Sequence, residues 1–473
     1  MTPIKGEIPT RLATFHGLGS IAYGVKDNGF STFLLLFYNQ VLGMDAKLVS
    51  FALMLALVLD GFVDPIIGHL SDRTYSRWGR RLPWLYLAPL PLALVWYFLW
   101  SATGEPSFWT LVFSAMAVRT LVSCCEVPSV ALVPELTRDY DERSRLMRYR
   151  YLFGWGGGLL IMFLAYNVFL SGGMLNPAGY QHYGLAGALL MAAAVLVSAF
   201  GQHRYAAGLP AVRPAPFSLR TAFAEITESL SHPAFLILLV AGGLAYTSQG
   251  ITFSVSNYLY LFVWRFSEGA FQIYPFVLFA SVVATFFTVG PMHKRWGKRN
   301  TGAVCAVIGM VFWVAPFILR HFGLWWTEGT VPSTAGLFVL FFFSNLFSVA
   351  AMISASSMVA DVVEASEAQT GRRAEGTFFA GNFFMQKCAT GLGIFVTGLL
   401  VDLAGMPEKA VPGQVAAGVI DRLALGYAVI VGIFAIAIAL VLRRFPITRA
   451  DHEARLAALA GARANPDASG MHP

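Results

Sequence analysis

An apolar run, a basic loop and a second apolar run follow one another over residues 46–100. They read AKLVSFALMLALVLDGFVDPIIGHL (46–70), SDRTYSRWGRR (71–81) and LPWLYLAPLPLALVWYFLW (82–100). A helix of about 20 apolar residues spans the hydrocarbon core of a bilayer, which is about 30 Å thick. Backbone groups in lipid must be paired within the chain. Each long apolar run therefore predicts a transmembrane helix, with the basic loop at the membrane surface.

Runs of the same kind recur along the whole chain. Of its 473 residues, 56% are hydrophobic and only 12% are charged, about half the charged fraction of a soluble globular protein. We therefore expect an all-α, polytopic membrane protein with twelve transmembrane helices in two pseudo-symmetric six-helix bundles. The expected helices lie near residues 15–42, 46–70, 83–102, 107–135, 151–171, 183–201, 233–262, 268–291, 302–320, 335–362, 376–403 and 418–442.

A polar, proline-containing stretch separates the first six expected helices from the last six. The two halves also repeat a loop motif. Arg77-Trp-Gly-Arg-Arg81 joins the second and third helices, and Arg295-Trp-Gly-Lys-Arg299 joins the eighth and ninth. Duplicated halves are typical of secondary transporters, although the basic bias of cytoplasmic loops could by itself make the two loops alike. The expected division is an N-terminal bundle (1–202), a cytoplasmic linker (203–232), a C-terminal bundle (233–445) and a cytoplasmic tail (446–473).

Lysine and arginine are distributed unevenly between the two sets of loops. They gather in the loops at 71–82, 137–150, 203–232, 293–300 and 363–375, while the opposite loops carry only Lys47, Arg265, Arg320, Lys409 and Arg422. Cytoplasmic loops carry the basic excess. We therefore expect a multi-pass protein of the inner (plasma) membrane with both termini in the cytoplasm. No cleavable signal peptide is visible, and the basic residues form no stripe that would bind nucleic acid.

Ionisable residues inside the apolar runs mark the candidate site, because a charge within the bilayer is costly unless it faces a cavity or a partner. Asp60 and Asp64 are spaced to share one face of the second helix. The two carboxylates repel each other unless one is protonated or a cation lies between them. The alternative is a pair of acids that reach water at the end of the helix.

The fourth and eleventh helices add further charged groups. Arg119, Ser123 and Glu126 share one face of the fourth helix. Glu126 supplies a third carboxylate and Ser123 a hydroxyl oxygen, unless Arg119 neutralises Glu126 in a purely structural pair. Lys387 lies near the middle of the eleventh helix and needs an anion, which the aspartates of the first or second helix would supply.

These residues resemble the glycoside–pentoside–hexuronide:cation symporters, the melibiose-permease branch of the major facilitator superfamily. The resemblance spans nearly the whole chain. It is carried by Asp60–Gly68 with Arg77–Trp84, Lys26-Asp27, Glu126-Val-Pro128 with Val133-Pro134, Asp361-Val-Val-Glu364, Thr370–Gly376 and Lys387.

The resemblance implies a cation site beside a sugar site. For the cation site it implies Asp60 and Asp64 with Ser123 and Glu126. For the substrate site it implies hydroxyl binding by Asp27 and Glu126, with Lys26, Arg150, Tyr151 and Lys387 close by. Three departures show that melibiose specificity does not carry over: Glu126 replaces the usual Asp, Val130 replaces a Trp, and the helix-five Arg is replaced near Tyr151, although Arg148 and Arg150 are close.

A cytoplasmic gate is expected where basic and acidic residues of the two halves face each other. Ion pairs between the halves would form while that side is closed and separate when it opens. A network is needed, because one exposed pair contributes only about 0–1 kcal/mol; the alternative is two solvated loops. The expected gate residues are Arg73, Arg77, Arg80, Arg81, Asp361, Glu364 and Glu367.

The leading functional interpretation is a secondary active transporter that carries a sugar or glycoside together with Na⁺ or H⁺ by alternating access. The alternatives are a carrier of an amphipathic or lipid-like solute and an integral-membrane enzyme or sensor. No GxSxG, HExxH or Walker motif occurs, and the 9 histidines are scattered. We therefore expect no enzyme activity, no cofactor and no metal beyond the coupling cation. The expected partners are a small-molecule substrate, a monovalent cation and membrane lipids, with the protein acting as a monomer.

Overall fold

The N-terminal half is built from helices that run back and forth. The computed structural model describes residues 7–102, 104, 107–137, 139–209, 233–370 and 375–444. The elements of this half are α1 (Thr10–Leu18), α2 (Ile21–Asn28), the π-helical segments η1 (Gly29–Phe33) and η2 (Phe37–Val41) around α3 (Leu34–Leu36), α4 (Ala46–Asp72), α5 (Leu82–Leu87), α6 (Pro89–Trp100), α7 (Phe108–Leu136), α8 (Tyr140–Leu164) with the π-helical η3 (Ala165–Phe169), and α9 (Pro177–Ala206).

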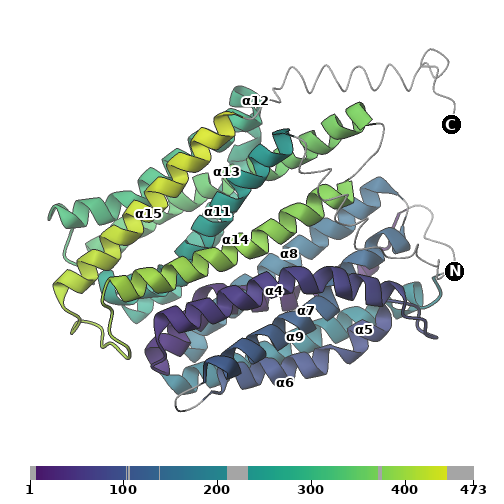
Figure 1. The fold of residues 1–473 in the computed structure, drawn as a ribbon, viewed down its shortest axis with the longest axis horizontal. Helices are drawn as coiled ribbons and strands as arrows, with labels where there is room; N and C mark the ends of the chain where they lie inside the picture. The colour runs from purple at the N-terminus through teal and green to yellow at the C-terminus, as the bar shows by residue number, and fades with distance from the viewer. Residues whose placement is uncertain are drawn as a thin grey trace.

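The C-terminal half lies beside the N-terminal half, above it in Figure 1. Its helix α14 packs along α4 of the first half. The elements of this half are α11 (Pro233–Tyr258) with the π-helical η4 (Leu259–Val263), α12 (Glu268–His321), α13 (Val331–Thr370), α14 (Glu375–Leu403) and α15 (Ala417–Arg443).

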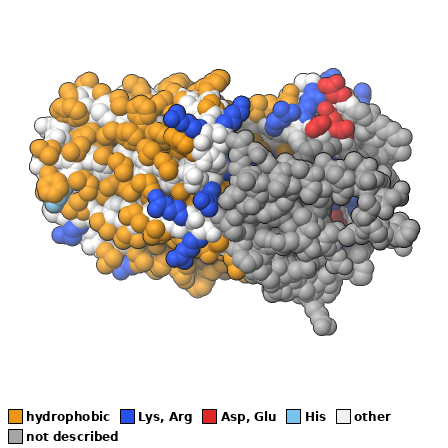
Figure 2. Space-filling model, turned by 90° about the horizontal axis from the view of Figure 1, so that it is seen from above, with side chains coloured by type: hydrophobic (Ala, Val, Ile, Leu, Met, Phe, Trp, Pro, Cys, Tyr) orange, Lys and Arg blue, Asp and Glu red, His pale blue; other side chains and the backbone are white. Residues whose placement is uncertain are grey.

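The described helices account for the membrane passes expected from the sequence. Nine helices within the described ranges are long and apolar enough to cross a membrane. Among them, α12 is long enough for two passes, and the broken segments α1–η2 and α5–α6 supply the remaining two. Hydrophobic side chains cover much of the described surface in Figure 2, as a lipid-facing exterior requires. The prediction of an all-α, polytopic membrane protein is confirmed.

Several expected boundaries differ from the structure by some residues, and two of the differences have a local cause. Helix α8 begins at Tyr140 rather than near residue 151, because the Asp139 side chain caps it by accepting from the Asp141 (2.9 Å) and Glu142 (3.0 Å) amides. Its first turns are charged, so an apolar pattern detects only the part beyond them. The helices expected near 268–291 and 302–320 both lie within α12 and meet at Gly297, whose backbone angles are not helical, so the expected break at 293–300 is a single residue rather than a longer loop.

The repeated Trp-Gly loops share a backbone feature. Gly79 has a φ of 83° and Gly297 a φ of 73°, both in the left-handed region that favours glycine. Each glycine follows a tryptophan and precedes a basic residue at the corresponding turn of its half. The motif therefore places a glycine with a left-handed backbone at the corresponding junction of both halves, which supports duplication.

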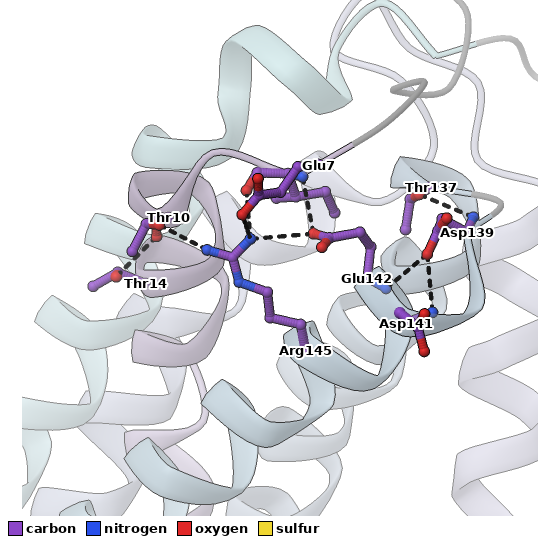
Figure 3. A network of polar contacts seen from close by, with 9 residues as sticks. Glu7, Thr10, Thr14, Thr137, Asp139, Asp141, Glu142 and Arg145 are labelled. Carbon is purple, nitrogen blue, oxygen red and sulfur yellow. Dashed lines mark hydrogen bonds and ion pairs between the residues drawn. The ribbon is translucent and has the colours of Figure 1, made fainter.

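The first described residues, Glu7 to Thr10, are fixed to the start of α8 (Figure 3). Arg145 donates to the carbonyl oxygen of Ile8 (2.9 Å) and to Thr10 Oγ1 (2.7 Å). The Ile8 amide donates to Glu142 Oε2 over 2.9 Å. Farther along, a Cβ on Gly24 would lie 1.9 Å from the carbonyl oxygen of Gly154. These contacts hold α1 and α2 close against α8, as small residues allow between membrane helices.

Hydrogen bonds between the halves close the end of the molecule away from the Trp-Gly loops. Asn257 of α11 donates to the Thr32 carbonyl oxygen (3.0 Å) and accepts from the Tyr166 hydroxyl (2.8 Å). The Tyr258 hydroxyl donates to Asn39 Oδ1 over 2.8 Å. Lys47 lies 3.0 Å from Asp402 at the same end. This end is therefore sealed in the conformation described here.

The two halves also touch closely along α4 and α14. A Cβ on Gly398 would lie 1.9 Å from Ser50 Oγ, and one on Gly391 would lie 3.1 Å from Leu57 Cβ. The lack of a side chain at these glycines lets the two helices approach each other. Their approach brings Lys387 of α14 within reach of the acids of α4.

Candidate cation and substrate site

Two aspartates of α4 share a hydroxyl from α7. Ser123 Oγ lies 3.0 Å from Asp60 Oδ1 and 2.6 Å from Asp64 Oδ1. A serine hydroxyl has one proton, so it donates to one of the carboxylates at a time. Asp60 and Asp64, which the helical spacing placed on one face of α4, thus form one polar cluster with Ser123 between α4 and α7.

Lys387 joins this cluster from the other half of the molecule. Its Nζ lies 2.9 Å from Asp60 Oδ2 and 2.5 Å from Asp64 Oδ2. A cationic group therefore lies between the two carboxylates and relieves the repulsion expected between them. The anion that a lysine in the middle of a membrane helix requires is this aspartate pair.

Arg119 of α7 is paired with Asp60. Its Nε lies 3.1 Å from Asp60 Oδ2, and the two side chains are only 3% and 4% exposed. The guanidinium also lies over the Phe30 ring, 5.1 Å from its centroid. The alternative pairing of Arg119 with Glu126 is therefore not the arrangement in the structure. The sequence did not predict the contact of Phe30 with Arg119, because no sequence pattern connects two residues so far apart in the chain.

Glu126 lies beside Arg150 of α8. Arg150 Nη2 is 3.8 Å from Glu126 Oε1, and Arg150 Nη1 donates to Ser129 Oγ over 2.7 Å. Tyr23 lines the same pocket of the N-terminal half. Ser129 was also missed from the sequence, although its spacing of three residues from Glu126 placed it on the same helix face.

Lys26 and Asp27 of α2 lie in different surroundings. The Lys26 side chain is buried, with Nζ 4.3 Å from the centroid of the Tyr23 ring and 3.8 Å from Asp27 Oδ1. The Asp27 side chain is 49% exposed. Lys26 is therefore held by its neighbours, while Asp27 is free to accept hydrogen bonds from a solute. Tyr151 of α8 is also exposed.

Three of the basic residues expected at the gate, Arg77, Arg80 and Arg81, have contacts within their own half. Arg80 Nη2 lies 2.8 Å and Arg81 Nε 3.0 Å from Glu135 Oε1, and Arg81 also binds Asp72. Arg77 lies over the Trp78 ring, and Arg73 ends α4. The side chains of Asp361, Glu364 and Glu367 lie outside the described residues. The gate between the halves therefore stays a prediction.

Most of the chain is similar in sequence to known membrane transporters. The family described as MFS/sugar transport proteins matches residues 15–449. The chain is 28% identical to a symporter of Synechocystis over 87% of this chain and 88% of that protein. It is 26% identical to the isoprimeverose transporter of Lactiplantibacillus pentosus, over 85% and 82% of the two chains.

A solved structure shares the fold at low sequence identity. The inward-facing, unoccupied structure of a bacterial homologue of the human lysosomal transporter Spinster superposes with a TM-score of 0.65 at 15% identity. The superposition covers 96% of this chain and 99% of that one. At this identity the likeness concerns the fold alone.

Proposed function

Because the chain belongs to the family of MFS/sugar transport proteins, we propose that it carries a sugar or glycoside across the inner membrane together with a monovalent cation, Na⁺ or H⁺. It is a multi-pass membrane transporter rather than an enzyme. One observation carries the proposal: Lys387 of one half binds Asp60 and Asp64 of the other. A charge-bearing site shared by both halves is where binding can be coupled to alternating access.

The substrate side is formed by groups that bind hydroxyls. Asp27 presents an accessible carboxylate, and Glu126 lies 3.8 Å from the guanidinium of Arg150. Charged acceptors and donors of this kind form the stronger hydrogen bonds to sugar hydroxyls. Tyr151 adds an exposed aromatic ring beside Arg150. A relative named as an isoprimeverose transporter supports a glycoside as the substrate class.

Glu126 couples the two ligands in this proposal. It follows Ser123 by one helical turn on α7, and the Ser123 hydroxyl lies within hydrogen-bond distance of both aspartates. A group shared by cation and substrate makes each ligand bind better when the other is present, and this coupling is reciprocal. We also propose that the protein acts as a monomer with both termini in the cytoplasm. The proposal keeps the division into two bundles, linker and tail expected from the sequence, and it assigns the basic loop 71–82 to a cytoplasmic gate.

Uptake into proteoliposomes tests the proposal. The purified chain is reconstituted and supplied with radiolabelled pentosides, glucosides, glucuronides and a lysophospholipid, with an inward Na⁺ gradient, an inward H⁺ gradient or neither. We expect accumulation of at least one glycoside under one of the gradients and loss of that accumulation in Asp27→Asn. Asp421→Asn is the matched control, because Asp421 pairs with Arg320 far from the site. Accumulation of the lysophospholipid alone, or of nothing under either gradient, would refute it.

A further inference from the structure

The described residues of the site carry as many positive as negative side chains. The cationic ones are Lys26, Arg119, Arg150 and Lys387, and the acidic ones are Asp27, Asp60, Asp64 and Glu126. Arg119 has no part in the proposed binding of cation or substrate. Without it the site would carry one net negative charge, which is the charge that a monovalent metal ion would neutralise.

The same balance holds at the aspartate pair alone. Asp60, Asp64 and Lys387 together carry one net negative charge, and the contact of Arg119 with Asp60 brings the sum to zero. All four carboxylate oxygens also have contacts within the protein. Both Oδ1 atoms face Ser123, both Oδ2 atoms bind Lys387, and Asp60 Oδ2 also receives Arg119 Nε. A metal ion would have to displace one of these groups.

Arg119 is poorly suited to being displaced. Its side chain is 3% exposed, it bonds Asp60, and it lies over the ring of Phe30. A guanidinium stays charged in proteins, so the site cannot lose this positive charge by deprotonation. A Na⁺ ion placed beside it would be a second positive charge in a buried region, where like charges repel far more strongly than in water.

We propose that Arg119 is the resident cation of this site, so that the protein has no need of Na⁺ or Li⁺ and Arg119 determines which ions the site accepts. The inference deepens the proposed function and rests on it, because it concerns which cation the proposed symport uses. It predicts that neutralising Arg119 creates a Na⁺ site from groups already present: Asp60, Asp64 and Ser123.

A Na⁺ titration of the full-length chain in detergent tests this without knowledge of the substrate. NaCl replaces choline chloride at constant ionic strength, and the heat of binding and the melting temperature are recorded. The native chain should show no saturable Na⁺ response. Arg119→Gln should bind about one Na⁺ per chain, with half-saturation at least about tenfold below the highest Na⁺ concentration at which the native chain shows no response, because the repulsive charge is gone.

Two further variants locate the effect. Arg119→Lys keeps the positive charge and should stay insensitive to Na⁺. Arg119→Gln combined with Asp60→Asn restores the charge balance and should lose the acquired binding. Saturable Na⁺ binding by the native chain that Asp60→Asn abolishes and Arg119→Gln leaves unchanged would overturn the proposal. If Arg119→Gln does not fold, the native chain and Arg119→Lys still decide it, since Na⁺ binding by both refutes it and binding by neither supports it.

The outcome is separable from that of the proposed function. A native chain that ignores Na⁺ yet accumulates a glycoside under a proton gradient supports both proposals. A native chain that ignores Na⁺ and accumulates nothing under either gradient supports the role of Arg119 and refutes the symport. Glycoside accumulation driven by a Na⁺ gradient in the native chain supports the symport and refutes the role of Arg119.

Discussion

Asp60 and Asp64 differ in burial and in partners, so their replacement by asparagine should have unequal consequences for stability. The Asp60 side chain is 4% exposed and binds both Arg119 and Lys387. The Asp64 side chain is 32% exposed and binds Lys387. Asp60→Asn leaves the buried Arg119 without its carboxylate, whereas after Asp64→Asn Lys387 retains Asp60.

The magnitudes follow from these contacts. Removing one partner of a buried ion pair costs about 3–5 kcal/mol, because the remaining charge is desolvated and uncompensated. Loss of a partly exposed pair costs about 1 kcal/mol or less. Removing both members of a buried pair costs far less than removing one. We therefore expect Asp60→Asn to be the least stable variant, Asp64→Asn to be close to the native chain, and Asp60→Asn with Arg119→Gln to recover most of the loss.

Thermal unfolding of the purified proteins in one detergent, at one pH and salt concentration, measures this order. Comparison of the single and double variants gives the coupling between Asp60 and Arg119 directly. Equal melting temperatures for Asp60→Asn and Asp64→Asn would refute the reasoning. So would a double variant whose loss equals the sum of the two single losses, because Arg119 and Asp60 would then not stabilise each other.

Three other predictions concern transport. Glu126→Gln should weaken substrate binding and cation stimulation together, by about tenfold or more for a lost charged hydrogen bond, in uptake titrations; loss of only one of them would exclude a shared role. Arg77→Glu should slow uptake if the cytoplasmic gate forms, and unchanged uptake would indicate two solvated loops. Asn257→Leu removes two hydrogen bonds between the halves, each of which contributes about 0.5–1.5 kcal/mol to holding this end closed. In a protein without the native cysteines that carries Ser31→Cys, this change should therefore speed alkylation of the introduced thiol. An unchanged alkylation rate would mean that Asn257 does not hold this end closed.

The fold was accessible from the sequence because each membrane pass must be apolar along its length. Features of the helices that do not depend on hydrophobicity could not be predicted in this way. The charged first turns of α8 continue a helix beyond its apolar part, and the Asp139 cap that begins it is a local hydrogen-bonding feature. The break at 293–300 was expected, but its limitation to Gly297 depends on a backbone angle, which hydropathy does not report.

The candidate site was partly accessible for a similar reason. Helical spacing placed Asp60 beside Asp64 and Ser123 on a face of α7, and the need of Lys387 for an anion pointed toward the aspartates. The partner of Arg119 could not be chosen from spacing. Glu126 lies on the same helix as Arg119, whereas Asp60 comes within reach of Arg119 only because α4 packs against α7. Sequence spacing shows which residues share a face of one helix, whereas the partner of Arg119 was decided by how two helices pack against each other.

The bond of Lys387 to two acids across the interface has a mechanical consequence. Its ammonium belongs to one half and its acceptors to the other, at 2.9 Å and 2.5 Å. A separation of the halves by about 1 Å along these contacts would stretch the first well beyond hydrogen-bond length and the second to its limit. The strength of this ionic contact therefore sets part of the resistance of the halves to rocking. Fluorophores on the ends of α9 and α15 should report a broader spread of separations when Lys387 is neutralised, even with no solute present.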